Sequence, residues 1–194
     1  MPETPETDKR LQILDSAETL FAERGYDGVS VREIALMVKL NHTTLYHHFP
    51  KGKEQMYVEV MERTFERHRA GMSEAIAQAG DDLTQQLYAV VDWLVAQPPL
   101  DMSRMQQADA RSLEADTAHR LMSLAYEAMT TPLNGALEQA YTAGKIAWID
   151  VSMASMALVT LVQTVHNLTD LPLNARKRIG YRLADLLLKG LLKR

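Results

Sequence analysis

Between residues 28 and 54 the chain reads GVSVREIALMVKLNHTTLYHHFPKGKE, a pattern typical of two short helices joined by a tight turn. Ser30 and Glu33 have the S-x-x-E spacing of a capping box, in which the hydroxyl accepts a backbone N–H and the carboxylate reaches back to the cap. Asn41 is the expected N-cap of the second helix, because its short side-chain amide can accept a free backbone N–H. Each helix therefore has its own start signal.

Apolar side chains recur at helical spacing on one face of each of these helices. Ile34, Ala35 and Val38 form the stripe of the first helix, and Leu45 and Phe49 point inward from the second. The faces left free on the second helix are polar or aromatic, and they carry His42, Thr43, Tyr46 and His47. A second helix held across a first, with such groups outward, suits insertion into a DNA major groove. The stretch predicts a helix-turn-helix.

The charges of this stretch agree with a DNA-docking surface. Lys39, Lys51 and Lys53 lie in a run without Asp or Glu, and the same run holds His42, His47 and His48. The whole chain has a net charge of -4, so the basic character is local. A local basic patch is what docking needs, because phosphate contacts supply most sequence-independent affinity. The alternative is a solvated helix pair in an unrelated helical protein, since short helix pairs are common.

A longer pattern around this stretch resembles the N-terminal DNA-binding domain of the tetracycline-repressor (TetR/AcrR) family of bacterial transcription regulators. The residues that carry the resemblance, over about residues 10–56, are Ile13, Ala17, Leu20, Phe21, Gly25, Tyr26, Val31, Ile34, Ala35, the run Leu45-Tyr46-His47-His48-Phe49, and Lys53-Glu54. The Thr-Leu-Tyr-x-His-Phe run followed closely by Lys-Glu is its most specific part. The remainder of the chain inherits little from the resemblance.

The resemblance implies an all-helical homodimer whose third helices read the half-sites of a palindromic operator, and a C-terminal domain whose small ligand weakens DNA binding. Thr43, Thr44, Tyr46 and His47 fall where the family's groove-facing and phosphate-contacting residues lie. Asn41 and His42, at the start of the same helix, are further expected DNA contacts. Lys53 falls on its phosphate-binding lysine. Ser30 and Arg32 fall on positions that often touch the DNA backbone.

Two positions depart from the family pattern. Lys39 stands where the family usually has Gly in the turn, and a left-handed backbone there costs Lys roughly 1 kcal/mol relative to Gly. A phosphate contact by Lys39 would compensate. The Pro50-Lys51-Gly52-Lys53 junction is one residue longer than the commonest form, which leaves the direction of Lys51 open.

The composition sets broad limits on the class of protein. The chain has 194 residues, 46% of them hydrophobic and 24% charged, which is ordinary for a globular protein able to bury a core. It contains no cysteine, so disulfide and thiol chemistry are excluded, and a cytoplasmic location is expected. The first ten residues lack the apolar core of a signal peptide.

Helix signals recur along the whole chain, and we expect an all-α fold of about nine helices. The expected domains are a helix-turn-helix domain over residues 1–52 and an effector-binding and dimerisation domain over 53–194. Expected helices in the second domain include residues 53–79, a helix capped by Asp81 or Asp82, a short helix from Asp101 to about Ala110, and a helix over 117–143 that Pro132 kinks or divides.

The last two expected helices point to a dimer. Residues 151–169 carry no formal charge but are too polar for a confident membrane span, so we expect a helix buried between helices or subunits. The final helix shows Ile179, Leu183, Leu186, Leu187 and Leu191 on one face. Such apolar faces exceed what one helical layer covers, so pairing with a second copy is the economical solution. Completion of a monomeric core is the alternative.

Soft and aromatic side chains gather in the middle of the chain, where they could line a ligand pocket between helices. The candidates are Phe65, Trp93, Met102, Met105, Met122, Tyr126, Met129 and Trp148, with His68, Arg104 and His119 as polar anchors. A plain hydrophobic core explains the same pattern. The effector would act by population shift, with the helix that begins near Lys53 as the moving element.

Other functions have little support in the sequence. There is no Gly-rich phosphate loop and no cysteine nucleophile, and the histidines lack the four-residue spacing of zinc helices, so neither an enzyme nor a metal or cofactor site is expected. The competing interpretation is a helical DNA-binding or interaction protein without a small-molecule effector. Sequence-independent DNA coating would need a broad basic surface, which a net charge of -4 disfavours.

Overall fold

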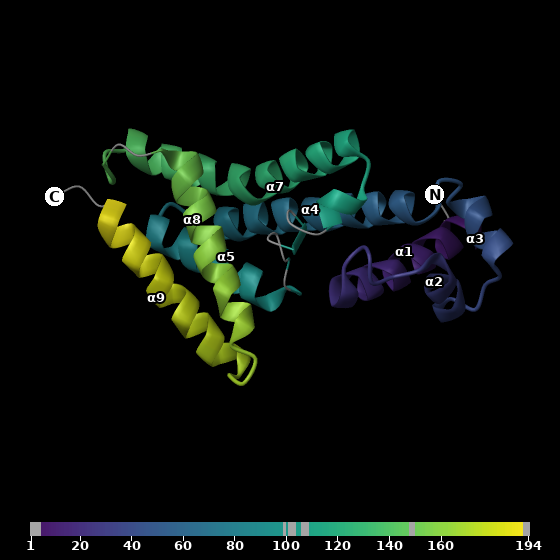
Figure 1. The fold of residues 1–194 in the computed structure, drawn as a ribbon. Coiled ribbons are helices and arrows are strands. Elements are labelled where there is room, and N and C mark those ends of the chain that lie inside the picture. Colours follow the sequence, from purple (N-terminus) through teal and green to yellow (C-terminus); the bar gives the residue numbers. More distant parts are fainter. Residues whose placement is uncertain (1–4, 99, 101–103, 106–108, 148–149, 192–194) are drawn as a thin grey trace. The chain divides into compact units, whose positions relative to one another are not determined.

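The structure is a computed structural model of the chain, and it describes residues 5–98, 100, 104–105, 109–147 and 150–191. Within these ranges the chain forms α-helices and 3-10 helices and no β-strand (Figure 1), which confirms the all-α prediction. The α-helices are α1 (Pro5–Arg24), α2 (Val31–Met37), α3 (His42–His48), α4 (Gly52–Gln78), α5 (Leu83–Ala96), α7 (Ala115–Thr142), α8 (Val151–Gln163) and α9 (Leu173–Leu191); the 3-10 helices are η1 (Asp109–Ser112) and η2 (Thr164–Asn167).

The chain divides into two compact units. Unit 1 comprises Met1–Thr64 and Leu100–Leu124, and unit 2 comprises Phe65–Pro99 and Ala125–Arg194. Helices α4 and α7 each contribute their first part to unit 1 and the rest to unit 2. Unit 1 therefore contains the whole expected helix-turn-helix together with a later stretch of chain.

Unit 1 has its core where α1, α2, α3 and the first turns of α4 meet. The completely buried side chains there include Ile13, Ala17, Ile34, Leu45, Phe49 and Met56. Two ion pairs join α1 to α4, one between Arg10 and Glu59 at 2.6 Å and one between Arg63 and Asp15 at 2.7 Å. The Arg10 guanidinium also lies over the Phe49 ring, 4.7 Å from its centre.

Unit 2 is built around α5, which packs against α8 and α9. Small and apolar residues form the buried seam of α9, namely Gly180, Ala184 and Leu188. The approach at Gly180 is close, because a Cβ atom built there would lie 2.5 Å from Val91 Cγ1. Beside the seam, Tyr181 donates a hydrogen bond to Asp92 at 2.6 Å. Any larger residue at Gly180 would push α9 away from α5.

Side-chain caps start the helices of unit 2 where the sequence suggested. Asp82, rather than Asp81, caps α5 by accepting the N–H of Gln85 at 3.0 Å. Asp150 caps α8 by accepting the N–H of Met153 at 3.0 Å. Helix α8 ends at Gln163 and is followed directly by η2, which ends at Asn167. Together they are shorter than the uncharged stretch of residues 151–169. None of the helices among the described residues is long and apolar enough to cross a bilayer.

Pro132 does not divide the helix that contains it. The 28-residue helix α7 runs through this position without a break, so the expected division is wrong, whereas the expected kink stays a prediction. Proline removes one backbone donor and crowds the preceding turn. The turns on both sides keep their own hydrogen bonds, and the loss of one is tolerated. Of the expected short helix between Asp101 and Ala110, Arg104 and Met105 are helical, residues 101–103 and 106–108 lie outside the described ranges, and Asp109 begins η1.

Candidate nucleic-acid interface

The capping box at the start of α2 is complete. The Ser30 hydroxyl accepts the backbone N–H of Glu33 at 3.3 Å, and the Glu33 carboxylate accepts the N–H of Ser30 at 2.8 Å. Arg24 contributes an ion pair to the same carboxylate at 2.8 Å. The hydrogen bonds from Ser30 and then from Arg24 lower the pKa of Glu33 to about 2. The cap therefore stays ionised at neutral pH and fixes the first turn of α2.

The turn between α2 and α3 uses the backbone conformation that the sequence anticipated. Lys39 has φ 55°, the one positive φ of a non-glycine residue in the described part of the chain. The N–H of Leu40 donates to the carbonyl of Ala35 at 2.9 Å, and the N–H of Lys39 donates to Leu36 at 3.1 Å. These two bonds form a Schellman motif, in which glycine is the usual residue at the left-handed position. Lys39 occupies that position with its side chain exposed.

Helix α3 is anchored at its start and along its inner face. The Asn41 side-chain oxygen accepts the N–H of Thr44 at 2.7 Å and its hydroxyl at 2.8 Å. Leu45 and Phe49 are completely buried. A seven-residue helix is far too short to be stable alone, so the cap and these two core residues hold it in place.

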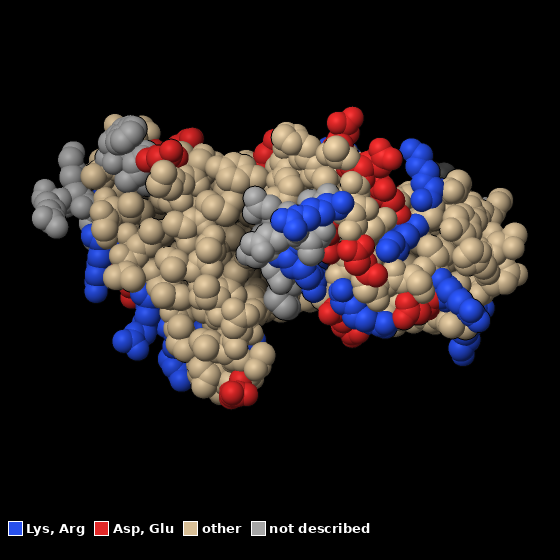
Figure 2. All heavy atoms as spheres, in the orientation of Figure 1, with Lys and Arg blue, Asp and Glu red and all other residues tan. Residues whose placement is uncertain are grey.

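The outer side of α3 and the residues around it are open to solvent. Exposed among the predicted contact residues are Ser30, Arg32, Lys39, Asn41, His42, Thr43, Tyr46, His47 and Lys51, whereas Thr44 and Lys53 are half-buried. The rings of His42 and Tyr46 meet edge to face, with centres 4.8 Å apart. Figure 2 shows that the end of unit 1 formed by α3 carries uncharged and basic side chains in this view, with acidic side chains gathered beside it.

Lys53 lies at the start of α4, but its ammonium group is held by the protein. Its Nζ donates to the carbonyl oxygen of Tyr26 at 3.1 Å and lies 4.0 Å from the centre of the Tyr26 ring. An ammonium group has three donors, so this bond leaves two for another acceptor. The sequence placed Lys53 at the surface that would face phosphate, and it did not anticipate the contact with Tyr26.

The sequence also did not indicate a second set of contacts in unit 1. Arg104 donates to the carbonyl oxygens of Phe21 and Ala22 at the end of α1, at 3.1 and 3.3 Å. Asp109 accepts the N–H of Tyr26 at 3.0 Å. We expected Arg104 to anchor a ligand, and the structure gives it these helix carbonyls as partners. Gly25 was the available signal, because only a residue without Cβ allows so close an approach of another chain segment.

The nine ligand candidates within the described ranges are divided between the two units. Arg104, Met105, His119 and Met122 belong to unit 1, and Phe65, His68, Trp93, Tyr126 and Met129 belong to unit 2. Phe65, His68, Met105 and Met129 are buried, Arg104, Trp93 and Met122 are half-buried, and His119 and Tyr126 are exposed. Met102 and Trp148 lie outside the described residues. Whether the candidates line one pocket stays a prediction.

Two of the candidates in unit 2 carry polar atoms that the described residues leave without a hydrogen-bond partner. They are Nδ1 of His68, a residue only 3% exposed, and Nε1 of Trp93. Burial, followed by the nearby charge of Arg67 and by His166, lowers the pKa of His68 to about 4. The imidazole is therefore neutral at physiological pH. Unpartnered buried polar atoms are uncommon in folded proteins and point to a missing partner.

The groove found on unit 1 has a different character. It measures about 510 Å³, and its lining mixes basic, acidic and neutral polar side chains with one valine, namely Lys51, Glu54, Gln55, Val58, Glu114, Asp116, Thr117 and Arg120. None of the nine ligand candidates appears in that lining. Mixed charge makes the groove unsuited to the apolar effector that a methionine and aromatic cluster would favour.

Unit 1 thus presents a capped recognition-type helix across a first helix, and this arrangement defines a helix-turn-helix protein. Residues 13–60 match the family model of bacterial regulatory proteins of the tetR family. The chain is thus similar to that family over these residues. That family consists of regulatory proteins rather than enzymes.

Curated relatives match stretches of similar length. The HTH-type transcriptional repressor KstR2 of Mycolicibacterium smegmatis is 44% identical over 62 residues, which cover 31% of this chain and 30% of the relative. The negative regulator of the biofilm operon icaADBC, IcaR of Staphylococcus epidermidis, is 39% identical over 54 residues, covering 28% of this chain and 29% of the relative. The matches thus span about three-tenths of the length of these relatives.

A solved structure extends the likeness to the whole fold. A TetR-family transcriptional regulator from Mesorhizobium loti superposes with a TM-score of 0.75 at 20% sequence identity, covering 98% of this chain and 100% of that chain. At this identity the likeness concerns the fold. It confirms the expected organisation of an N-terminal helix-turn-helix followed by further helices.

Proposed function

We propose that the protein is a transcriptional repressor of the cytoplasm that binds a palindromic operator as a homodimer and leaves it when a small-molecule effector binds. The observation that carries the proposal is the outer side of α3, which is exposed and rigidly held. The Asn41 cap and the buried Leu45 and Phe49 fix the helix, while Thr43, Tyr46 and His47 face solvent.

The chemistry of this face suits the two kinds of DNA contact. Hydroxyl, phenol and imidazole groups on α3 can hydrogen-bond to base edges in the major groove, where each base pair presents a distinct pattern. Lys39 and Lys51 are exposed on either side of α3, and Lys53 has free donors at the start of α4. Lysines in these places would contact phosphate and fix the register of the helix without reading sequence.

The apolar outer face of α8 and α9 supports a homodimer. Met153 on α8 is 69% exposed and Leu186 on α9 is 67% exposed. Ile179, Leu183 and Leu187 on α9 are half-buried, although the sequence placed them on the apolar face. Pairing these two helices with the same helices of a second copy would cover them. It would also allow two α3 helices to lie one DNA turn apart, about 34–36 Å.

The unpartnered polar atoms of unit 2 support an effector. Trp93 Nε1 can only donate, so a ligand that satisfies it supplies a hydrogen-bond acceptor. The buried Phe65 and Met129 would add apolar contacts. The effector must bind the DNA-incompetent arrangement more tightly, and a shift from 1:99 to 99:1 requires about 5.5 kcal/mol of differential affinity.

Selection of duplexes from a random library by the purified protein tests the DNA part of the proposal. We expect an inverted repeat to be enriched and to bind at least about a thousandfold more tightly than scrambled duplex at the same salt concentration. Equal affinity for both duplexes would support a helical DNA-binding or interaction protein without operator specificity. A library without any enriched motif would count against the proposal in the same way.

A gel shift on the selected operator tests the effector part. Small-molecule extracts of cells grown on different carbon sources are added to the preformed complex, with heat-denatured protein as the control for nonspecific quenching. Release by at least one extract is expected. Persistent binding in all of them, together with a dimer that binds the operator tightly, would leave a repressor without a small-molecule effector.

A further inference from the structure

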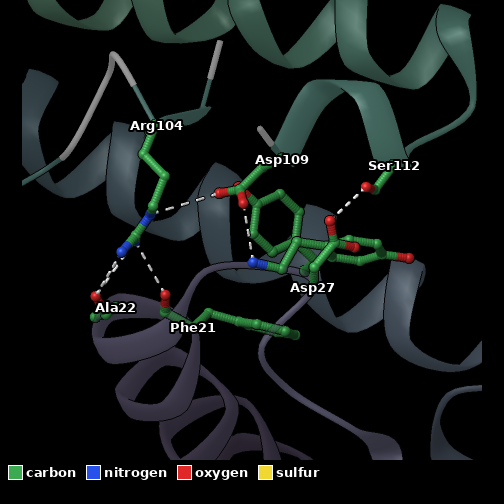
Figure 3. Close-up of polar contacts among 8 residues, drawn as sticks. Phe21, Ala22, Asp27, Arg104, Asp109 and Ser112 are labelled. Carbon is green, nitrogen blue, oxygen red and sulfur yellow. Dashed lines mark hydrogen bonds and ion pairs between the residues drawn. The ribbon is translucent and has the colours of Figure 1, made fainter. Parts of the chain in front are cut away.

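A segment far along the chain closes over the corner between α1 and α2. Figure 3 shows Arg104, Asp109 and Ser112 directed toward this corner, where Arg104 meets the last carbonyls of α1. Ser112 donates to Asp27 at 2.7 Å. We call the described residues 104–105 and 109–112 the strap. All of these contacts lie within unit 1.

Asp109 is the buried centre of the strap. The residue is 4% exposed, and its two carboxylate oxygens accept separate hydrogen bonds, from the N–H of Tyr26 at 3.0 Å and from the hydroxyl of Tyr57 at 2.8 Å. The guanidinium of Arg104 lies 4.0 Å away and offsets its charge. Gly25 makes room, since a Cβ there would lie 3.0 Å from the Asp109 carboxylate.

Tyr26 joins this carboxylate to the lysine at the DNA-facing surface. Its N–H is fixed by Asp109, and its carbonyl oxygen and ring are the two groups that hold the ammonium of Lys53. The Tyr26 ring is itself packed edge to face against Tyr57, with centres 5.1 Å apart. Asp109 therefore constrains Tyr26 both through its backbone and, by way of Tyr57, through its ring.

We propose that Asp109 is a positioning residue for phosphate binding, which acts through Tyr26 to hold the ammonium of Lys53 where it meets the DNA backbone. With one donor spent on the Tyr26 carbonyl, Lys53 presents its remaining donors from a fixed place rather than from a mobile side chain. Release of the strap would free Tyr26 and with it the lysine. This inference rests on the proposed DNA-binding function.

A double-mutant cycle between Asp109 and Lys53 tests the inference. The full-length protein and the variants Asp109→Ala, Lys53→Met and Asp109→Ala/Lys53→Met are titrated with fluorescent duplex at several salt concentrations. Lys53→Met is expected to lower the slope of log K against log salt by about 0.9, the value of one phosphate contact. Asp109→Ala is expected to lower the slope in the same direction, and to add nothing further when Lys53 is already Met.

Two further variants separate positioning from general damage. Ser112→Ala removes a hydrogen bond of the same strap that does not involve Tyr26, and it should leave the slope unchanged. Asp109→Asn keeps one acceptor for the Tyr26 N–H and should restore most of the binding lost in Asp109→Ala. Should Asp109→Ala fail to fold by circular dichroism, the cycle is run with Tyr57→Phe, which removes only the hydroxyl bond to Asp109 and should give the same pattern at smaller size.

The inference is overturned if the effects of the Asp109 and Lys53 substitutions simply add, or if the Asp109 variant keeps the wild-type slope. Measurements on scrambled duplex keep this outcome separate from failure of the proposed function. Phosphate contacts form on any duplex, so the cycle remains informative even if no operator preference exists.

Discussion

The outer side of α3 in unit 1 and the outer side of α8 and α9 in unit 2 are both exposed, but their chemistry is opposite. The first presents histidines, a threonine and a tyrosine, whereas the second presents Met153 and Leu186. A polar helix face can remain exposed to water without a covering partner. An apolar face of this kind is what the proposed homodimer would cover.

The interiors of the two units differ in how one buried polar side chain of each is hydrogen-bonded. In unit 1 the buried carboxylate of Asp109 has a hydrogen bond on each oxygen. In unit 2 the buried His68 has a ring nitrogen that the described residues leave unpartnered. The His68 nitrogen is therefore a group that the proposed effector would satisfy.

The largest effect is expected from a charge on the apolar face of unit 2. Leu186→Glu should convert a dimer into monomers and weaken operator binding by about a hundredfold or more, because the two half-sites would no longer be bound by one assembly. Sedimentation velocity measures the first effect and anisotropy the second. Arg178→Glu, at an exposed and already polar position of α9, is the matched control. A Leu186→Glu protein that remains dimeric would remove this face from the interface.

Substitution on the polar face of unit 1 should act on specificity. Tyr46→Ala or His47→Ala should cost about 1–3 kcal/mol on operator and much less on scrambled duplex, because a base contact is lost. Lys53→Ala should instead weaken binding to both duplexes, and it should lower the salt dependence of binding by the equivalent of about one phosphate contact. Competition titrations measure both ratios. If each substitution gave the pattern expected of the other, the assigned contact roles would be exchanged.

The unpartnered imidazole of unit 2 predicts a pH dependence. The pKa of His68 in the folded chain is about 4, below its ordinary value, so the unfolded chain binds the proton more readily. Its contribution to stability is complete above about pH 6.5 and is lost as the pH falls toward 4, and the loss amounts to about 2 kcal/mol at pH 5. Urea unfolding at pH 7 and pH 5 measures it. A His68→Leu protein with the same pH dependence as wild type would contradict the assignment.

Matched caps in the two units offer a direct comparison. Asn41→Ala and Asp82→Ala each remove an N-cap and should each cost about 1 kcal/mol of stability, seen in thermal or urea unfolding. Only Asn41→Ala should also weaken operator binding, since its helix carries the DNA-facing residues. Equal losses of binding in both variants would mean that the effect on DNA passes through global stability.

The smallest effect concerns the turn before α3. Lys39→Gly should stabilise the protein by about 1 kcal/mol or less, because the left-handed backbone at φ 55° costs a residue with Cβ. The same substitution should lower the salt dependence of DNA binding if the Lys39 ammonium contacts phosphate. A loss of stability in urea would contradict the backbone argument, and Lys39→Ala, which keeps the Cβ, separates the two effects.

How far the sequence could predict this molecule depends on the range of each interaction. The Ser30–Glu33 box and the Asn41–Thr44 cap join residues three positions apart, and they were visible in the chain as written. The inward direction of Leu45 and Phe49 follows from helical periodicity. The contact between Asp109 and Tyr26 spans 83 positions, and nothing local at either residue indicates the other.

The sequence by itself determined the helical class, the helix-turn-helix with its caps and strained turn, and the residues that face outward from α3. Only the tertiary structure decided that Lys53 rests on Tyr26, that the strap closes over the α1–α2 corner, and that Gly180, Ala184 and Leu188 form the inner seam of α9. The physical reason is that caps and periodicity are interactions within about one helical turn, whereas packing depends on which distant surfaces fit together.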